Sequence, residues 1–243
     1  MQKIKKNLKK FINIKTYSIF KILLFLVLDI KNFKLYFFIL KNIKESYSQI
    51  FQDLFVIFTL KKMKNGYFVE VGGGDGEYLS NSIYLEKKYS WTGLICEPSK
   101  KNLYKFKKRK CILIPYPVDD TCGKKVKFYE NKDSYLSGIN KITNYKHYEL
   151  ETLCLNHILK KNCEKKVIDY LSIDTEGNEF EIIKNLNFDN FQISIISIEH
   201  NFNKINRSKI KILLEKNNFI RVFKNISYMD DWYINKNLEN HLL

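Results

Sequence analysis

Alanine is absent from this 243-residue chain, and proline, glycine and arginine are scarce, with 3, 9 and 3 copies. So little proline and glycine excludes a collagen-like or low-complexity chain, and a hydrophobic content of 45% excludes a disordered one. Three arginines are few for a surface that grips phosphates, which argues against a nucleic-acid partner. No two of the five cysteines have the spacing of a zinc knuckle or redox motif. We therefore expect a folded cytoplasmic protein with reduced thiols.

Positive charge is concentrated near the N-terminus. Residues 1–66 hold 14 Lys and 3 acidic residues, a net charge of +11, which leaves +5 for residues 67–243. Two apolar runs, at residues 22–28 and 35–40, are far shorter than the ~20 residues of a membrane-spanning helix. Asp29 closes the first run with no cleavage site after it, so we expect no signal peptide.

Residues 1–46 therefore form a basic N-terminal extension, for which two interpretations stay open. In the first, one or two amphipathic helices pack on the domain. In the second, the same residues make a peripheral contact with anionic lipid at a membrane surface. Equal pelleting of the full chain and of residues 47–243 with liposomes would exclude the second.

From residue 67 the sequence alternates short apolar runs with polar stretches. The runs span residues 67–71, 92–96, 111–114, 169–173 and 193–198, and helix-like stretches span 77–89, 100–108, 150–159, 179–186 and 208–217. Near-continuous apolar runs are typical of parallel strands covered on both faces, so the pattern predicts a doubly wound α/β domain over residues 47–243. Residues 119–150 interrupt the rhythm, and we expect an insertion there with a hairpin or substrate loop near residues 124–130.

Acidic side chains accompany the ends of these runs. The first run contains Glu70, and the others are followed in order by Glu97, by Asp119 and Asp120, by Asp174, and by Glu199. The carboxyl ends of parallel strands share one edge of a sheet, which is where such folds bind ligands. Several acids on one edge of a basic protein predict a site for a ligand with hydroxyl groups or positive charge.

A cluster of glycines ends the first run, in the sequence VEVGGGDG at residues 69–76. Glycines allow a tight turn that brings the backbone close to a ligand, and a following helix would supply free N–H groups. The dinucleotide fingerprint G-x-G-x-x-G would need glycine where Glu77 stands. Glu97 follows Gly76 by 21 residues, the offset at which a carboxylate accepts hydrogen bonds from ribose hydroxyls. Asp75 could equally be a helix cap.

The spacing acid-x-Gly-x-Gly-x-Gly resembles the first motif of S-adenosylmethionine-dependent methyltransferases, and residues 47–235 resemble the FkbM family of these enzymes. The matching segments are SQIFQD at 48–53, FVEVGGGDG at 68–76, LSNS at 79–82, GLICEP at 93–98, LSIDTEGNE at 171–179 and IEH at 198–200. The chain departs from the family at Gly73 and Gly74, which replace the more usual small residue and Asn.

This resemblance implies a Rossmann-like class I methyltransferase fold, S-adenosylmethionine as the methyl donor, and O-methylation of a sugar or glycoconjugate. Together with the acidic edge, it assigns cofactor binding to Glu70, Gly72, Gly74, Asp75, Gly76, Ser80, Asn81, Glu97, Pro98 and Asp119. The general base that deprotonates the acceptor hydroxyl is expected among Asp174, Glu176, Glu199 and His200. A divalent cation held by Asp174, Glu199 and His200 is an alternative role that the reaction does not require, so no metal ligand is assigned.

Smaller assignments and other functions stay open beside this one. Gln52 and Asp53 either fold over the cofactor or form a polar helix face, and Glu176 or Glu179 could serve only as helix-terminal charge. The methyl acceptor could be RNA or protein, although the low Arg content argues against RNA. The chain could also be a cofactor-binding or membrane-surface scaffold without catalytic activity. No protein partner can be inferred, and we expect the insertion and the extension to build the acceptor pocket.

Overall fold

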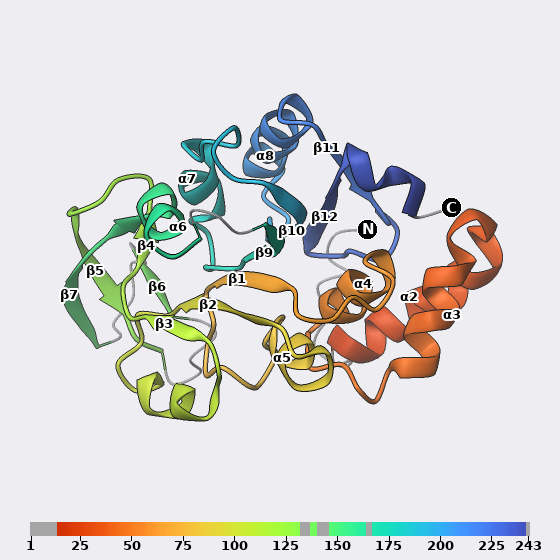
Figure 1. Ribbon diagram of the computed structural model, residues 1–243, viewed down its shortest axis with the longest axis horizontal. Helices are drawn as coiled ribbons and strands as arrows, with labels where there is room; N and C mark the ends of the chain where they lie inside the picture. The colour runs from red at the N-terminus through yellow and green to blue at the C-terminus, as the bar shows by residue number, and fades with distance from the viewer. Residues whose placement is uncertain (1–13, 132–136, 140–145, 164–166, 242–243) are drawn as a thin grey trace, which may run out of the picture.

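The computed structural model describes residues 14–131, 137–139, 146–163 and 167–241. Its centre is a seven-stranded sheet in the order β11-β12-β10-β9-β1-β2-β3 (Figure 1). These strands are β1 (Tyr67–Val71), β2 (Thr92–Cys96), β3 (Ile112–Ile114), β9 (Ile168–Ile173), β10 (Ile193–Glu199), β11 (Phe219–Val222) and β12 (Asp230–Asn235). The five strands expected from the sequence are present and parallel, and β12 runs antiparallel to both of its neighbours.

The strand order reverses beside β1. The chain runs outward from β1 through β2 to β3, then returns to the other side of β1 with β9 and continues outward to β10. In a doubly wound sheet this reversal opens a crevice at the carboxyl ends of the strands. The predicted Rossmann-like fold is therefore confirmed, and the reversal places the ends of β1 and β9 at the crevice.

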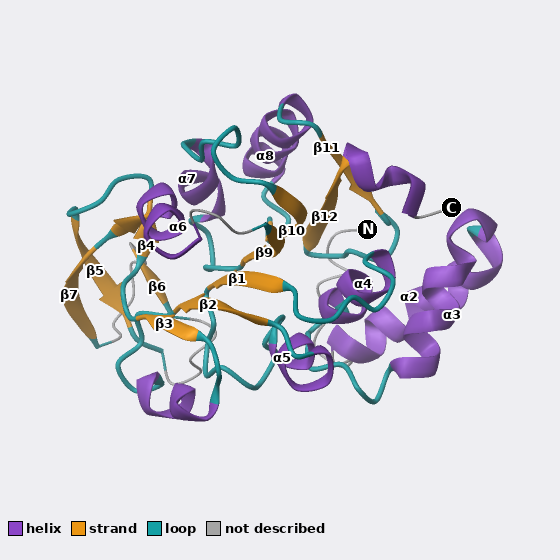
Figure 2. Cartoon of the chain, in the orientation of Figure 1, coloured by secondary structure: helices purple, strands orange, loops and turns teal. Residues whose placement is uncertain are grey.

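Helices cover both faces of the central sheet (Figure 2). The helices α6 (Leu155–Cys163), α7 (Glu179–Lys184) and α8 (Lys204–Lys216) pack on one face, and α4 (Gln52–Thr59) and α5 (Ile83–Tyr89) pack on the other. Side chains of β1 alternate between the two apolar layers, since Val69 and Val71 join the first and Phe68 joins the second. Burial on both faces explains why the strand sequences are almost continuously apolar.

The basic extension packs on the second face as two helices, α2 (Ile14–Leu28) and α3 (Phe33–Asn42), joined by the 3-10 turn η1 (Ile30–Asn32). Ile22, Leu35 and Ile39 are buried in the same apolar layer as α4. Among the described residues, no helix is long and apolar enough to cross a bilayer.

The region of the expected insertion contains five short strands. They are β4 (Val118–Asp119), β5 (Lys125–Tyr129), β6 (Gly138–Ile139), β7 (His147–Glu151) and β8 (Leu153–Cys154). β6, β5 and β7 form a small antiparallel sheet at the left of Figure 1, and β4 pairs with β8. Because β7 occupies residues expected to be helical, α6 begins only at Leu155.

Two other expected helices also differ from the structure. The stretch 100–108 contains the 3-10 helix η2 (Leu103–Lys108), and α5 begins at Ile83 instead of near residue 77. The delay in α5 has a physical cause, since the Glu70 carboxylate accepts hydrogen bonds from Ser80, Asn81 and Ser82. These bonds hold the segment before α5 as an irregular turn instead of a helix.

Trp232 of β12 packs the central sheet against α4. Its ring stacks on Phe55 of α4 with the centroids 4.6 Å apart, and its side chain is fully buried. Its indole Nε1 has no hydrogen-bond partner among the residues that the structure describes, whereas Nε1 of buried Trp91 donates to the Met63 carbonyl at 2.9 Å.

We expect Trp232→Ala to lower the free energy of unfolding by about 3–5 kcal/mol because it leaves a large cavity. Trp232→Phe should cost less than Trp91→Phe, because only the second change removes a side-chain hydrogen bond. Urea denaturation of the three variants measures these values. Equal losses for the two Phe variants would contradict the assigned difference between the indoles.

Candidate active site

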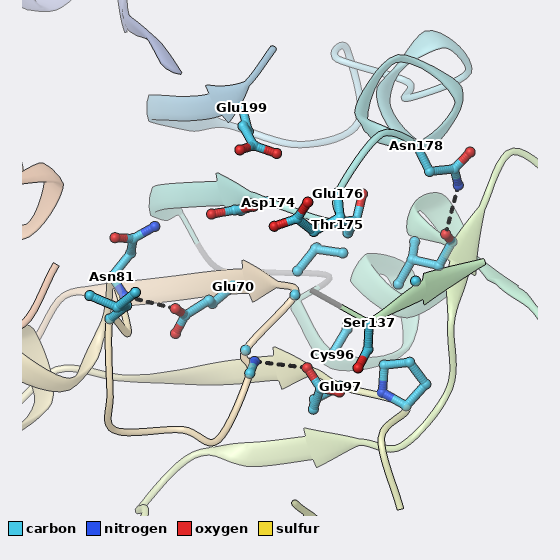
Figure 3. A pocket seen from close by; sticks show the side chains of 18 of the residues that line it. Glu70, Asn81, Cys96, Glu97, Ser137, Asp174, Thr175, Glu176, Asn178 and Glu199 are labelled. Atoms are coloured by element: carbon cyan, nitrogen blue, oxygen red, sulfur yellow. Dashed lines mark hydrogen bonds between the residues drawn. The ribbon is translucent and has the colours of Figure 1, made fainter. Parts of the chain in front are cut away.

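A cavity of about 320 Å³ opens at the carboxyl ends of β1, β2, β9 and β10 (Figure 3). This volume lies within the range of about 300–1,000 Å³ that is usual for small-molecule sites. Ten of the fourteen residues predicted for the site line it, namely Glu70, Gly72, Gly74, Ser80, Asn81, Glu97, Pro98, Asp174, Glu176 and Glu199. Four of the acids expected at the strand ends, Glu70, Glu97, Asp174 and Glu199, therefore line this cavity.

The carboxylate of Glu97 links the end of β2 to the glycine turn that follows β1. Its Oε2 accepts a hydrogen bond from Gly74 N at 2.8 Å, and its Oε1 accepts one from Ser99 N at 2.8 Å. Burial raises the pKa of Glu97 to about 8, although the two N–H donors oppose this shift. Each oxygen keeps a second lone pair that can accept a hydrogen bond from a ligand in the cavity.

The glycine turn itself is held against β9. Gly72 has a φ of +91°, and a Cβ placed on it would lie 1.7 Å from the carbonyl oxygen of Asp174. No other residue fits in that position, because both its φ and the adjacent backbone exclude a side chain. The turn consequently brings its backbone close to Asp174 and leaves the cavity open above it.

Glu70 positions the wall of the cavity next to the turn. Its two oxygens accept hydrogen bonds from Asn81 N at 2.8 Å, from Ser80 Oγ at 3.1 Å and from Ser82 Oγ. Burial raises the pKa of this carboxyl, and nearby Arg109 opposes the shift. The amide of Asn81 donates to Ser172 on β9, whereas its buried Oδ1 has no partner within the described part of the chain.

Asp174, Glu176 and Glu199 converge on the opposite side of the cavity, as Figure 3 shows. Carboxylate oxygens of the three residues all lie within 4.8 Å of one another. Burial raises the pKa of both Asp174 and Glu199, and the charges of neighbouring acids raise them further. Glu176 adopts a left-handed backbone conformation with a φ of +64°, a strained geometry of the kind that proteins retain at functional sites.

Glu179 has a different role from Glu176. Its Oε1 accepts hydrogen bonds from the backbone N–H groups of Thr175 and Gly177 and from the Thr175 hydroxyl. It therefore fixes the turn between β9 and α7, and Glu176 is the residue of this pair that reaches the cavity.

A further acid, Asp230, lies beside the cluster. It pairs with Glu199 across the antiparallel β10–β12 ladder and accepts a hydrogen bond from Gln52 Nε2 at 2.9 Å. Burial raises the pKa of Asp230 to about 7, and its charge is the second cause of the raised pKa of Asp174. Sequence reasoning missed this residue because it is not at the end of a parallel strand. Gln52 itself lines the cavity, which agrees with the first of its two interpretations.

The cavity lining is acidic, whereas the protein as a whole is basic. Five acidic side chains line the cavity, and none of the described lining residues is Lys, Arg or His, although the chain carries a net charge of +16. The three arginines are paired elsewhere, Arg109 with Glu86 and both Arg207 and Arg221 with Asp231. The cavity thus favours a ligand with hydroxyl groups or positive charge and disfavours a phosphorylated one.

His200 requires a correction, since it does not line the cavity. Successive residues of a strand point to opposite faces, so His200 faces away from the side that Glu199 occupies. Its Nε2 lies 3.6 Å from Asp231, and its Nδ1 accepts a hydrogen bond from Phe202 N. Burial lowers the pKa of His200 to about 4, so it is neutral near pH 7. It joins neither the candidate bases nor the three carboxylates that could hold a cation.

Asp75, Gly76 and Asp119 also lie outside the cavity lining. Asp75 caps the turn by accepting hydrogen bonds from Glu77 N and Tyr78 N, and Gly76 directs its carbonyl to Arg109. Asp119 is buried and pairs with Lys124 at 2.8 Å.

Asp53 has a structural role outside the cavity as well. It is fully buried and accepts hydrogen bonds from the Ser46 hydroxyl and from Tyr47 N. Because Asp53 does not line the cavity, the first of its two interpretations, a cover for the cofactor, does not fit this position.

The sequence also left part of the lining unassigned. Ile14 of the extension lines the cavity, as do Phe128 and Ile139 of the insertion and Tyr116 after β3. Both the extension and the insertion were expected to contribute to an acceptor pocket, but no local signal identified these residues, because only the folded chain brings α2, β5 and β6 to the ends of the parallel strands.

Comparison with known proteins gives one family match. The model described as the methyltransferase FkbM domain matches residues 70–232, about two thirds of the chain. No curated protein matches the chain.

Among solved structures, precorrin-6y C5,15-methyltransferase from Geobacter metallireducens GS-15 is 12% identical with a TM-score of 0.43, and the alignment covers 75% of this chain and 85% of that one. TrmK of M. capricolum, in complex with S-adenosyl-homocysteine, is 16% identical with a TM-score of 0.39, and the alignment covers 75% and 67%.

Removing one charge from the acidic cluster should stabilise the protein at high pH. Folding raises the pKa of Glu199 above its unfolded value, so its ionisation opposes folding, and stability is lost as pH rises above about 4.5. Glu199→Gln should therefore raise the free energy of unfolding by about 1–3 kcal/mol at pH 8 and by little at pH 4.

Thermal unfolding measured across pH tests this expectation. Glu215→Gln on α8, which removes an acid that is 47% exposed, is the matched control and should show no such pH-dependent gain. A gain for Glu199→Gln that does not change with pH would contradict the like-charge explanation.

Proposed function

The chain belongs to the methyltransferase FkbM domain family, and we propose that it transfers a methyl group from S-adenosylmethionine to a hydroxyl of a sugar or glycoconjugate. Methyltransferase activity follows from the family, whereas the acceptor is inferred from the cavity. The observation that carries this inference is the lining itself, which combines five acids, several amides and hydroxyls, and no basic side chain among its described residues.

The residues of the cavity fit S-adenosylmethionine. Glu97 offers free lone pairs beside the glycine turn, and its carboxylate can accept hydrogen bonds from both ribose hydroxyls. The unpartnered Oδ1 of Asn81 offers a buried acceptor on the same wall. The acidic cluster favours the positive charge of the methionine part, because opposite charges attract strongly in a buried site.

When bound, S-adenosylmethionine supplies an electrophilic methyl group on a positively charged sulfur. The enzyme then has to align an acceptor hydroxyl and remove its proton. Asp174 and Glu199 suit the second task because their carboxyls line the cavity, and a positive charge bound beside them lowers their raised pKa values so that one can ionise and accept the proton. Glu176, the third member, can accept a hydrogen bond from a neighbouring hydroxyl of the acceptor and so orient it.

The same lining argues against an RNA acceptor. RNA binding depends on basic side chains that neutralise phosphates, and the cavity would instead repel a phosphate through its acids. Sugar hydroxyls both donate and accept hydrogen bonds, so carboxylates and amides satisfy them without a charge on the ligand. An amine of a protein side chain is compatible with the acidic cluster as well, and the assay below separates the two acceptors.

Above about pH 8, where the Glu97 carboxyl is ionised, Glu97→Gln should weaken S-adenosylmethionine binding by at least about tenfold, since two charge-assisted hydrogen bonds to ribose become neutral ones. Because burial raises the pKa of Glu97 to about 8, binding to the unaltered protein should tighten as pH rises from about 6 to 8. Titration calorimetry measures both effects. Glu77→Gln, a change at an exposed acid beside the same turn, is the control. Unchanged affinity of the Glu97 variant would overturn the ribose assignment.

Transfer of a radiolabelled methyl group to fractionated acceptors tests the proposed reaction. Label should enter the glycan fraction, and Asp174→Asn should reduce turnover by about 100-fold or more, a larger factor than its loss of cofactor affinity. Label in RNA or protein would replace the proposed acceptor. Wild-type turnover of the Asp174 variant would exclude Asp174 as the base, and Glu199→Gln would then identify the alternative.

A further inference from the structure

The outer face of the N-terminal helix pair exposes an apolar stripe. On α2, the side chains of Phe20, Leu23 and Val27 are 62%, 51% and 73% exposed, and Leu24 completes the i, i+3, i+4, i+7 spacing of one helix face. Ile30, Phe33 and Phe37 extend the exposed apolar surface through η1 and along α3. Surface helices of soluble domains normally place polar side chains at such positions.

This concentration is unusual within the protein. Sixteen large hydrophobic side chains are exposed among the described residues, and eight of them lie between residues 20 and 37. The remaining eight are distributed over more than 130 residues of the other elements, which is ordinary for a soluble surface. A concentration of exposed apolar side chains of this kind indicates an interaction site.

The length and composition of α2 indicate which kind of site it is. Its 15 residues, IKTYSIFKILLFLVL, are apolar on nearly all sides, so one side packs on the domain through Ser18 and Ile22 and the other remains exposed. A helix of this length spans about 22 Å, which is too short to cross the ~30 Å core of a bilayer. It is long enough to lie in the plane of a membrane surface.

The charged residues around the stripe indicate which kind of partner it binds. Residues 1–46 hold eleven Lys and two acids, and the exposed Lys31, Lys34 and Lys41 flank the apolar side chains. The acid nearest the stripe, Asp29, accepts hydrogen bonds from Asn32, Tyr36 and Asn225. Apolar side chains bordered by lysines match an anionic bilayer, in which acyl chains lie beneath negative headgroups.

We propose that α2, η1 and α3 form a docking surface for an anionic lipid bilayer. The stripe Phe20, Leu23, Leu24 and Val27 enters the boundary between headgroups and acyl chains, and the flanking lysines contact anionic headgroups. Ile14, the first residue of α2, lines the active-site cavity, so docking would hold the bilayer within about one helix length of the site. This proposal does not depend on the identity of the methyl acceptor.

Co-sedimentation of the full chain with vesicles tests the proposal. Vesicles of phosphatidylcholine with about 30% phosphatidylserine should pellet the protein, and pure phosphatidylcholine should pellet much less of it. The triple variant Phe20→Gln, Leu23→Gln, Val27→Gln should lower partitioning by at least about tenfold, because three apolar side chains no longer leave water. Lys31→Glu with Lys41→Glu should weaken binding most at low salt.

The matched control is Ile205→Gln with Ile212→Gln on α8. These side chains are 69% and 68% exposed on another helix with neighbouring lysines, so their replacement should leave vesicle binding unchanged. All changed side chains are exposed, and matching melting temperatures would confirm that each variant is folded. Absence of wild-type binding to anionic vesicles, or equal loss in the α8 control, would overturn the proposal. If the unaltered protein forms dimers, and the triple variant is monomeric but still binds vesicles as the unaltered protein does, the stripe instead contacts a second copy of the chain.

Discussion

The paired hydrogen bonds of Glu97 are the contact on which the site depends. One buried carboxylate holds the N–H of Gly74 in the turn after β1 and the N–H of Ser99 after β2, so the ends of two neighbouring strands are fixed at one point. Gly72, packed against the carbonyl of Asp174, fixes the same turn to the end of β9. These contacts set the relative positions of the candidate ribose acceptor and the candidate base, which lie on different strands. Without them the crevice at the strand reversal would have no defined shape.

The acidic cluster has the opposite character, since it opposes folding. Asp174, Glu176, Glu199 and Asp230 lie close together in or beside a buried cavity with no basic side chain among its described lining residues. Burial raises the pKa values of Asp174, Glu199 and Asp230, and repulsion from neighbouring acids raises them further, a cost that packing elsewhere in the protein offsets. Proteins retain such arrangements where a ligand needs them. A cationic cofactor and a hydroxyl acceptor both relieve the cost, the first by its charge and the second by donating a hydrogen bond to a carboxylate.

Strand pattern and strand ends made most of this site predictable. Continuous apolar runs identified the parallel strands, and the acids at their ends identified Glu70, Glu97, Asp174 and Glu199, because the carboxyl ends of parallel strands share one edge. The glycine cluster and the family resemblance identified the other six lining residues. The wrong assignments occur where a contact between distant parts of the chain changes what the local sequence pattern predicts. His200 was assigned with its neighbour Glu199, yet strand alternation turns it toward Asp231, and α5 begins late because Glu70 binds the segment before it. Asp230 comes from an antiparallel strand late in the chain, and only the folded sheet places it beside Glu199.

The most direct test of the account is a crystal structure with bound S-adenosyl-homocysteine, the form of the cofactor after transfer. The account predicts that the Glu97 carboxylate lies within hydrogen-bond distance of both ribose hydroxyls, and that the sulfur faces Asp174 and Glu199. A ribose bound away from Glu97, or a sulfur directed away from the acidic cluster, would contradict it.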